Sequence, residues 1–182
     1  VDDLPDGPLL IVGNELFDAI PLRQFVKTPQ GWRERMVGSG GTDMLRFEAG
    51  TAGLDRTLLP PDAADAPIGS IFETAPAREA MMRTICERLA RFGGAGLFID
   101  YGHTASALGD TFQALKHHEP VDPLAEPGLA DLTSHVDFAA LATAAHDALV
   151  LPRAQQPAHR VKRGAGHLGD VLARDREVDL DT

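Results

Sequence analysis

The chain has 182 residues, of which 43% are hydrophobic and 24% charged, so it is long enough for about one globular domain with a real core. Its 27 acidic and 17 basic residues give a formal charge of −10, which argues against nucleic acid or an anionic membrane as the main partner. The single cysteine, Cys86, excludes an intramolecular disulfide. No apolar run approaches the roughly 18 residues that a membrane span needs, so the composition predicts a soluble, intracellular protein.

The pattern of apolar and turn residues in the first part of the chain predicts strands. Residues 8–13 form a short apolar run after a Pro/Asp/Gly turn, which is typical of a buried strand. Residues 23–26 and 32–37 are extended stretches around residues 27–31, which predicts a hairpin whose loop is longer than two residues. Residues 38–67 carry many Gly, Pro, Ala and Asp and are expected to form a loop-rich surface excursion.

A strand, a helix and a further strand follow. Residues 68–73 predict a strand, and residues 76–92 have apolar side chains at helical spacing, with Thr74 as a candidate cap and Gly93 as the stop. Residues 95–99 are apolar throughout, which predicts a strand buried on both faces in a parallel sheet covered by helices. This succession makes an α/β layered domain the predicted fold class.

The remainder of the chain is divided between a long connection, a helix and a tail. Residues 101–129 are rich in Gly, Pro and His, and a connection of this length is usually functional. Asp137 is a candidate cap for a last helix over residues 138–149. Residues 151–182 hold no aromatic side chain and are expected to pack poorly, so we predict a main domain over residues 1–150 and an atypical tail.

Polar side chains follow the first predicted strand. Asn14, Glu15 and Asp18 come directly after it, and ligands of open α/β sheets bind beyond the carboxyl ends of the strands. A carboxamide and two carboxylates could orient a cofactor amine or a cationic substrate nitrogen. The alternative is structural, with Asp18 capping the next turn and Glu15 solvated.

A second candidate group follows the strand over residues 95–99. Asp100, Tyr101, Gly102 and His103 lie at its carboxyl end, where Asp100 could hold a substrate or fix His103. Gly102 would allow a tight backbone turn. The alternative is an aspartate that is satisfied by backbone amides of a turn.

Acidic and histidine residues of the later part form a third group, without the spacing of a metal site. Its members are Asp110, His117, His118, Asp131, His135 and Asp137. Such side chains suit zinc or iron, but no HxxxH or HExxH pattern organises them on one helix face, so no metal ligand is assigned. No serine lies in a GxSxG elbow, which gives no support to a serine hydrolase.

Several segments, in order, resemble the MidA-type methyltransferases, a family that includes a mitochondrial complex I assembly factor that methylates arginine. The matching segments are IVGNELFDAIPLRQFV, GWRERMVG, ETAPAREAMM, FIDYGH, GDTFQALKHH and ADLTSHVDFAALA. They extend over residues 8–148, and so many long motifs in order rarely occur by chance.

The resemblance implies a Rossmann-like class I methyltransferase fold with a β-hairpin insertion, which uses S-adenosylmethionine. It makes Glu15 and Asp18 candidate catalytic residues that hold a guanidinium, and Asn14 a candidate cofactor contact; carboxylates pair bidentately with a guanidinium and fix its nitrogen. The candidate substrate-binding residues are Asp100, Tyr101, Gly102, His103, Asp110, Asp131, Thr133 and His135.

The resemblance is to the C-terminal portion of the family. Family members carry their glycine-rich cofactor loop upstream of these motifs, so we expect a partial fold without the N-terminal half that holds the cofactor loop. The arginine-rich tail over residues 151–182 does not match the family and is interpreted as poorly packed or translated in a shifted reading frame.

The predicted activity is methyl transfer from S-adenosylmethionine to an arginine of a protein substrate, such as a respiratory complex I subunit or its homologue. The abundance of arginine over lysine favours a protein of the bacterial cytoplasm, or of the mitochondrial matrix if the source is eukaryotic. A homodimer is a further possibility that the sequence leaves open. Two alternatives remain at this point. One is a non-catalytic module that binds a partner through the hairpin over residues 22–37 and the connection over residues 101–129, and the other is a metal-dependent hydrolase.

Overall fold

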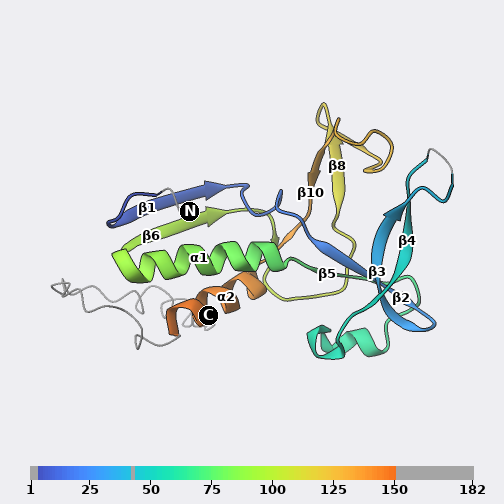
Figure 1. Cartoon of the computed structure of the whole chain (residues 1–182), viewed down its shortest axis with the longest axis horizontal. Helices are drawn as coiled ribbons and strands as arrows, with labels where there is room; N and C mark the ends of the chain where they lie inside the picture. Colours follow the sequence, from blue (N-terminus) through green and yellow to red (C-terminus); the bar gives the residue numbers. More distant parts are fainter. Residues whose placement is uncertain (1–3, 42–43, 151–182) are drawn as a thin grey trace, which may run out of the picture. The chain divides into compact units, whose positions relative to one another are not determined.

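The structure of the protein, a computed structural model, describes residues 4–41 and 44–150 (Figure 1). One group of elements is formed by the parallel strands β1 (Leu9–Asn14) and β6 (Gly94–Ile99) with the helices α1 (Pro76–Phe92) and α2 (Phe138–Val150). An antiparallel sheet is formed by β2 (Arg23–Thr28), β3 (Gly31–Gly38), β4 (Arg46–Gly53) and β5 (Ile71–Thr74), in the order β4-β3-β2-β5. The smaller elements are η1 (Arg56–Leu58), η2 (Pro61–Ala64), β7 (Gly102–His103), β8 (Gln113–Lys116), β9 (Glu119–Val121), β10 (Asp131–Thr133) and β11 (Val136–Asp137).

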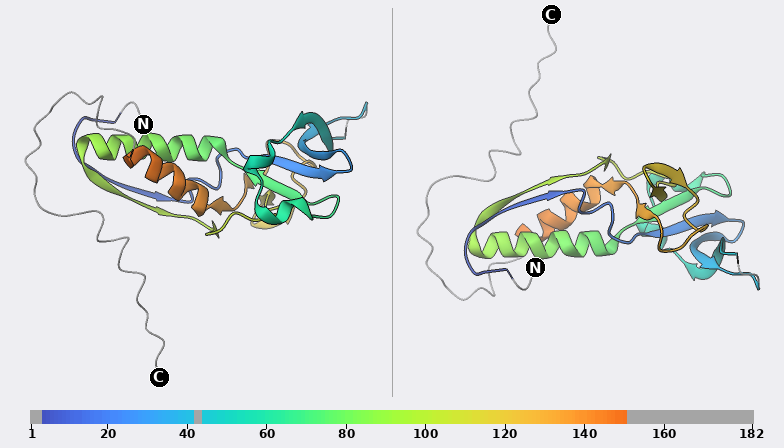
Figure 2. Two further views of the ribbon diagram at one scale, coloured as in Figure 1. Left: turned by 90° about the horizontal axis from the view of Figure 1, so that it is seen from below. Right: turned by 90° about the horizontal axis from the view of Figure 1, so that it is seen from above.

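The strands β1 and β6 run in parallel, with Leu9 opposite Gly94 and Asn14 opposite Ile99. Both helices lie on the same side of this pair, as the two views of Figure 2 show. Because side chains alternate along a strand, the opposite face carries Leu10, Val12, Leu97 and Ile99, which are 53% to 86% exposed. The expectation that the strand over residues 95–99 is buried on both faces is therefore wrong for the part of the chain that the structure describes, because helices cover only one face.

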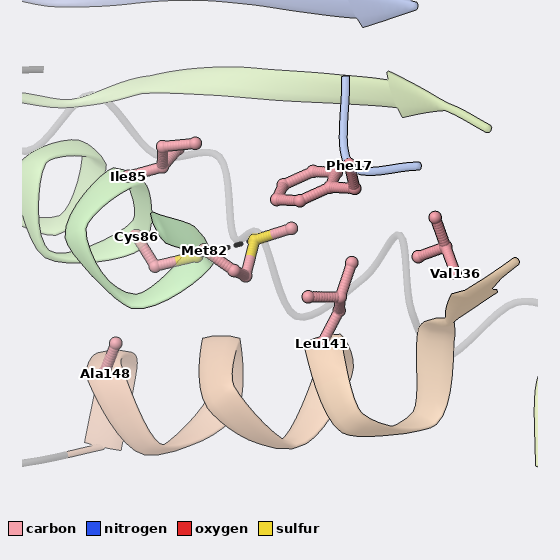
Figure 3. Close-up of a cluster of buried hydrophobic side chains, with 7 residues drawn as sticks. All are labelled: Phe17, Met82, Ile85, Cys86, Val136, Leu141 and Ala148. Atoms are coloured by element: carbon pink, nitrogen blue, oxygen red, sulfur yellow. Dashed lines mark hydrogen bonds between the residues drawn. The ribbon is translucent and has the colours of Figure 1, made fainter. Parts of the chain in front are cut away.

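The main core lies between the strand pair and the two helices (Figure 3). Helix α1 contributes Met82, Ile85 and Cys86, which share a face because they lie three or four residues apart. Phe17, from the segment after β1, is fully buried and meets the ring of Phe98 edge to face at 5.3 Å. This packing fixes the segment after β1 against the helices.

The helix boundaries confirm the predicted lengths but not every cap. Helix α1 ends at Gly93, which has a φ of +82° that favours glycine. Its N-cap is Ala75, without a side-chain hydrogen bond, so the prediction of Thr74 as the cap is wrong; Thr74 is the last residue of β5 and pairs with Arg23. Asp137 does cap α2, because its Oδ1 accepts a 3.0 Å hydrogen bond from the amide of Ala140.

The antiparallel sheet confirms the hairpin and corrects two details. Thr28 pairs with Gly31, so the β2–β3 loop has two residues and is shorter than expected. The segment over residues 38–67 is not a loop excursion alone, since it contains β4, which pairs with β3. A second core supports this sheet and consists of Phe25, Trp32, Ala63 and Phe72.

The connection over residues 101–129 is more regular than expected. It contains β7, β8 and β9, and β8 pairs with both β9 and β10. The short strands β7 and β11 pair in parallel and bring Gly102 beside Val136. None of the described helices is long and apolar enough to cross a membrane. The predictions for the tail over residues 151–182 lie outside the described residues.

Candidate functional site

The carboxyl ends of β1 and β6 are joined by hydrogen bonds, which bring the first two candidate groups together. The amide of Glu15 donates to the carbonyl oxygen of Ile99 at 2.8 Å. Asp100 Oδ2 accepts from the amides of Phe17 and Asp18 at 2.9 and 3.3 Å. Asp100 therefore holds the backbone after β1 in place. This arrangement corresponds to the structural alternative, in which backbone amides satisfy the aspartate, rather than to a contact with His103.

Asp18 is the most unusual carboxyl group of the site. It is 4% exposed, and its Oδ2 accepts a 2.6 Å hydrogen bond from the hydroxyl of Tyr101. Its Oδ1 is buried and has no hydrogen-bond partner within the described residues. A buried acceptor without a donor costs free energy, and such groups in native proteins call for a ligand or a functional reason.

The bond to Asp18 also affects Tyr101. It raises the pKa of the phenol above its usual value, because it stabilises the protonated donor, and burial acts in the same direction. Thr133 hydrogen-bonds to the same hydroxyl and lowers the pKa by a smaller amount. The hydroxyl thus stays protonated at neutral pH and keeps the carboxylate of Asp18 fixed.

Glu15 and Asn14 are exposed at the end of β1. Glu15 has a φ of +49°, a left-handed conformation that few non-glycine residues adopt. Strained backbone of this kind is concentrated at functional sites. The geometry therefore leaves both side chains free to face a ligand beyond the strand end.

The loops of the site are fixed by a buried arginine of α1, Arg78. It is 2% exposed and donates to the carbonyl oxygens of Asp18, Ile20 and His135 at 2.7 to 3.1 Å, and to the hydroxyl of Ser134. Burial lowers the pKa of its guanidinium, and the negative charges of Asp100, Glu73 and Asp18 oppose that shift, in this order. The guanidinium thus bonds to carbonyl and hydroxyl oxygens, and the three carboxyl groups act on it through their charge.

A second network connects the antiparallel sheet to the loops of the site. Glu73 accepts hydrogen bonds from the side-chain amide of Gln24 at 2.7 Å and from the amide and hydroxyl of Thr111 at 3.0 and 2.5 Å. Thr111 Oγ1 in turn accepts from the amide of His135 at 3.0 Å. Asp110 accepts from Gln24 at 2.7 Å, so this predicted substrate residue is engaged in the network.

The remaining predicted site residues lie in two places. Thr133 and His135 lie beside Tyr101, whose ring meets the imidazole of His135 edge to face at 6.0 Å. Gly102 packs against the carbonyl oxygen of Val136, and Asp131 is exposed on β10.

His103 belongs to a different cluster, and its geometry bears on the hydrolase alternative. Its Nε2 lies 3.8 Å from Oδ2 of Asp137, which also accepts a 2.5 Å hydrogen bond from Ser106. The serine is thus bonded to the carboxylate and not to the imidazole that would have to activate it. The described residues also contain no group of three His, Cys, Asp or Glu side chains that could hold a metal ion.

The sequence analysis did not single out Arg78, Glu73 or Gln24. A signal for Arg78 was present, because it precedes Met82 by four residues and Ile85 by seven and so lies on the apolar face of the helix. A charged residue on a buried face needs partners and often has a role. Gln24 and Glu73 carry no comparable signal.

Comparisons with known proteins show which family the chain resembles. Residues 1–154 match the family model described as "Putative S-adenosyl-L-methionine-dependent methyltransferase". The chain is 37% identical over 153 residues to "Protein arginine methyltransferase NDUFAF7 homolog, mitochondrial" of Caenorhabditis elegans, with 83% of this chain and 36% of the relative covered. It is 36% identical over 148 residues to the human protein arginine methyltransferase NDUFAF7, with 76% and 31% covered.

Two solved structures from Burkholderia thailandensis are similar to the chain. One, an uncharacterised protein, has 34% identity and a TM-score of 0.66, with 81% of this chain and 41% of that chain covered. The other, bound to S-adenosyl-homocysteine, has 30% identity and a TM-score of 0.63, with 81% and 40% covered. The chain thus spans about a third of the length of these curated relatives and two fifths of the solved structures. These matches confirm the resemblance to the MidA-type proteins and a mixed α/β fold, and the chain belongs to this family of S-adenosylmethionine-dependent methyltransferases.

Proposed function

We propose that the chain takes part in methyl transfer from S-adenosylmethionine to an arginine nitrogen of a protein substrate. The observation that carries the proposal is the buried carboxylate of Asp18, with one oxygen held by Tyr101 and the other without a partner in the described residues. A guanidinium has donors in a fork that suits such an acceptor. The names of the curated relatives, which are protein arginine methyltransferases, support this choice of acceptor.

In this proposal β1, β6 and the two helices form part of a Rossmann-like class I methyltransferase fold, and the antiparallel sheet β2–β5 is an insertion. Asn14 and Glu15 would border the cofactor, since they are exposed at the end of a parallel strand. The described residues fit only part of S-adenosylmethionine. Strand β5 leads directly into α1 in the described segments, and Ala75 joins the two rather than a glycine-rich loop. When bound, S-adenosylmethionine supplies the methyl group.

The chain's own residues would orient the acceptor and receive its proton. Asp18 holds the guanidinium, so that one nitrogen points at the methyl carbon. That nitrogen forms the new N–C bond while the C–S bond breaks, and it loses a proton. Glu15, whose side chain is exposed, takes this proton to solvent. A respiratory complex I subunit or its homologue is the acceptor protein that the resemblance implies.

The proposal is tested with Glu15→Gln and Asp18→Asn in a radiolabelled methyl-transfer assay on arginine-containing protein. We expect Glu15→Gln, which removes the proton acceptor, and Asp18→Asn, which misplaces the acceptor nitrogen, each to lower kcat by about 100-fold, while the Kd for S-adenosylmethionine from calorimetric titration changes little. Glu87→Gln, at an exposed position of α1, is the control and should keep full activity. Full activity of Asp18→Asn would refute the proposal.

A further inference from the structure

A cavity of about 380 Å³ lies next to Asp18, and its walls come from elements outside the strand pair. The antiparallel sheet contributes Val37 and Phe47, and the segment over residues 112–134 contributes Phe112 and Leu132. The rings of Phe47 and Phe112 meet edge to face at 6.4 Å. Apolar walls with a few polar groups are typical of a ligand site of this size.

The buried side chains of this cavity are polar. Asp18, Gln24 and Ser134 line it and are 1% to 7% exposed. Gln24 and Ser134 have partners, since Gln24 bonds to Glu73 and Ser134 to Arg78. Oδ1 of Asp18 is the buried side-chain atom of this lining without a partner in the described residues. The cavity thus combines apolar walls with a buried carboxyl group, one oxygen of which has no partner in the described residues.

The charged side chains around the cavity favour the binding of one further cation. Arg23 is paired with Glu34, and Arg35 with Asp110, each at 2.7 Å. These pairs neutralise the arginines that line the cavity. Among the charged side chains that line the cavity, Asp18 is the one without an ion pair in the described residues, which favours a cationic ligand.

We propose that this cavity binds the side chain of the acceptor arginine, with its hydrocarbon stem against Phe112 and Leu132 and its guanidinium at Asp18; this rests on the proposed function. One wall of the cavity already packs against a guanidinium of the chain itself. The Arg35 guanidinium carbon lies 3.7 Å from the centroid of the Phe47 ring. A guanidinium presents its donors in a planar fork that suits a carboxylate, whereas lysine presents only a point charge, so Asp18 favours arginine over lysine.

The test is NMR titration of the 182-residue chain with acetyl-Gly-Gly-Arg-Gly-Gly-amide, with the lysine and norleucine peptides as comparisons. We expect the arginine peptide to shift the resonances of Phe47, Phe112 and Leu132 and to bind more tightly than the other two. Leu132→Lys should weaken binding about tenfold or more, because it places a positive charge in the wall. Leu129→Lys adds the same charge at a more exposed position outside the lining and should leave binding unchanged.

The outcomes separate this proposal from the proposed function. Binding of the arginine peptide in the cavity without methyl transfer in the radiolabelled assay would retain the cavity and refute the function. Methyl transfer with a KM for the peptide that Leu132→Lys does not change would refute the cavity and retain the function. Absence of peptide binding by the folded chain at millimolar concentration, or equal losses in Leu132→Lys and Leu129→Lys, would also refute the cavity.

Discussion

At the scale of single residues, Arg78 has the greatest influence on the site. Its guanidinium connects the segment after β1 to the loop before β11, because it binds the carbonyl oxygens of Asp18 and His135 at once. A lysine has one nitrogen and could not make bonds from three nitrogens to both segments. The shape of the site thus depends on a residue that touches no proposed ligand.

Arg78→Met should lower the free energy of unfolding by about 3 to 5 kcal/mol, because it leaves the carbonyl oxygens of Asp18, Ile20 and His135 without their hydrogen-bond donor. Urea denaturation measures this change. Arg91→Met is the control, since Arg91 is exposed near the end of the same helix, and it should change stability by less than about 0.5 kcal/mol. Equal effects of the two substitutions would contradict the assigned role.

Glu79 should give the protein a pH-dependent stability. Burial raises the pKa of its carboxyl group, an effect that Arg83 partly opposes. The folded chain therefore keeps a proton that the unfolded chain has lost. The contribution of Glu79 is fully present below the unfolded pKa of about 4.3 and is lost as the pH rises through the folded pKa.

Glu79→Gln should therefore be more stable than the parent at pH 7, and the difference should shrink as the pH falls towards 4. Urea denaturation at several pH values measures it. Glu87→Gln, at an exposed position of the same helix, should show no such trend. A stability difference for Glu79→Gln that is the same at pH 4 and pH 7 would rule out this interpretation.

At the scale of elements, the close pairing of β7 and β11 sets the position of the loops around Tyr101. A Cβ on Gly102 would collide with the backbone of Val136, whereas a Cβ on Gly109 would have no atom nearer than 4.0 Å. Neither residue has a positive φ, so the two positions differ mainly in space. The strands can approach this closely only because residue 102 is a glycine.

Gly102→Ala should lower the free energy of unfolding by about 1 to 3 kcal/mol, the usual cost of overpacking. Gly109→Ala should change it by less than about 1 kcal/mol. Thermal unfolding followed by circular dichroism compares the two. A loss in Gly109→Ala as large as that in Gly102→Ala would show that the loss of glycine, and not the collision, is responsible.

Elements with a clear pattern of hydrophobic residues were predictable from the sequence. Helix α1 was predicted because Met82, Ile85 and Leu89 repeat at helical spacing, and β1 because of its short apolar run. Strand β4 was missed because its sequence, RFEAGTAG, is rich in small residues and becomes a strand through pairing with β3.

The candidate site was predictable only where it follows a strand. Asn14, Glu15 and Asp18 were found because they come directly after β1. The bond between Gln24 and Asp110 joins residues 86 positions apart, and no local pattern indicates such a partner. The same holds for the cavity, whose lining residues come from five separate stretches of the chain.

At the scale of the whole molecule, the described residues leave an apolar sheet face exposed. Leu10 and Val12 on β1 and Leu97 and Ile99 on β6 lie on this face, opposite the helices. Contiguous apolar patches of this kind are uncommon on soluble monomers and mark interaction surfaces. The 182-residue chain should therefore bind a hydrophobic dye while it is folded.

We expect the folded chain to increase the fluorescence of anilinonaphthalene sulfonate, and Leu10→Lys to reduce that increase without loss of stability. Ile68→Lys is the control, because Ile68 is 68% exposed in the segment before β5 and does not belong to this face. Dye fluorescence and urea denaturation are measured on the same samples. An equal reduction in both variants would contradict the assignment of the dye to the sheet face.

The parallel pairing of β1 and β6 also has a consequence for biosynthesis. The bond between Phe17 and Asp100, which closes this pair, spans 83 residues. At a translation rate of about 5 to 20 residues per second, β1 leaves the ribosome on the order of ten seconds before its partner is complete. The hairpin of β2 and β3, with its two-residue loop, can form during that interval. During that interval β1 is a short apolar segment without this partner, and its pairing is completed only after the residues of β6 have been synthesised.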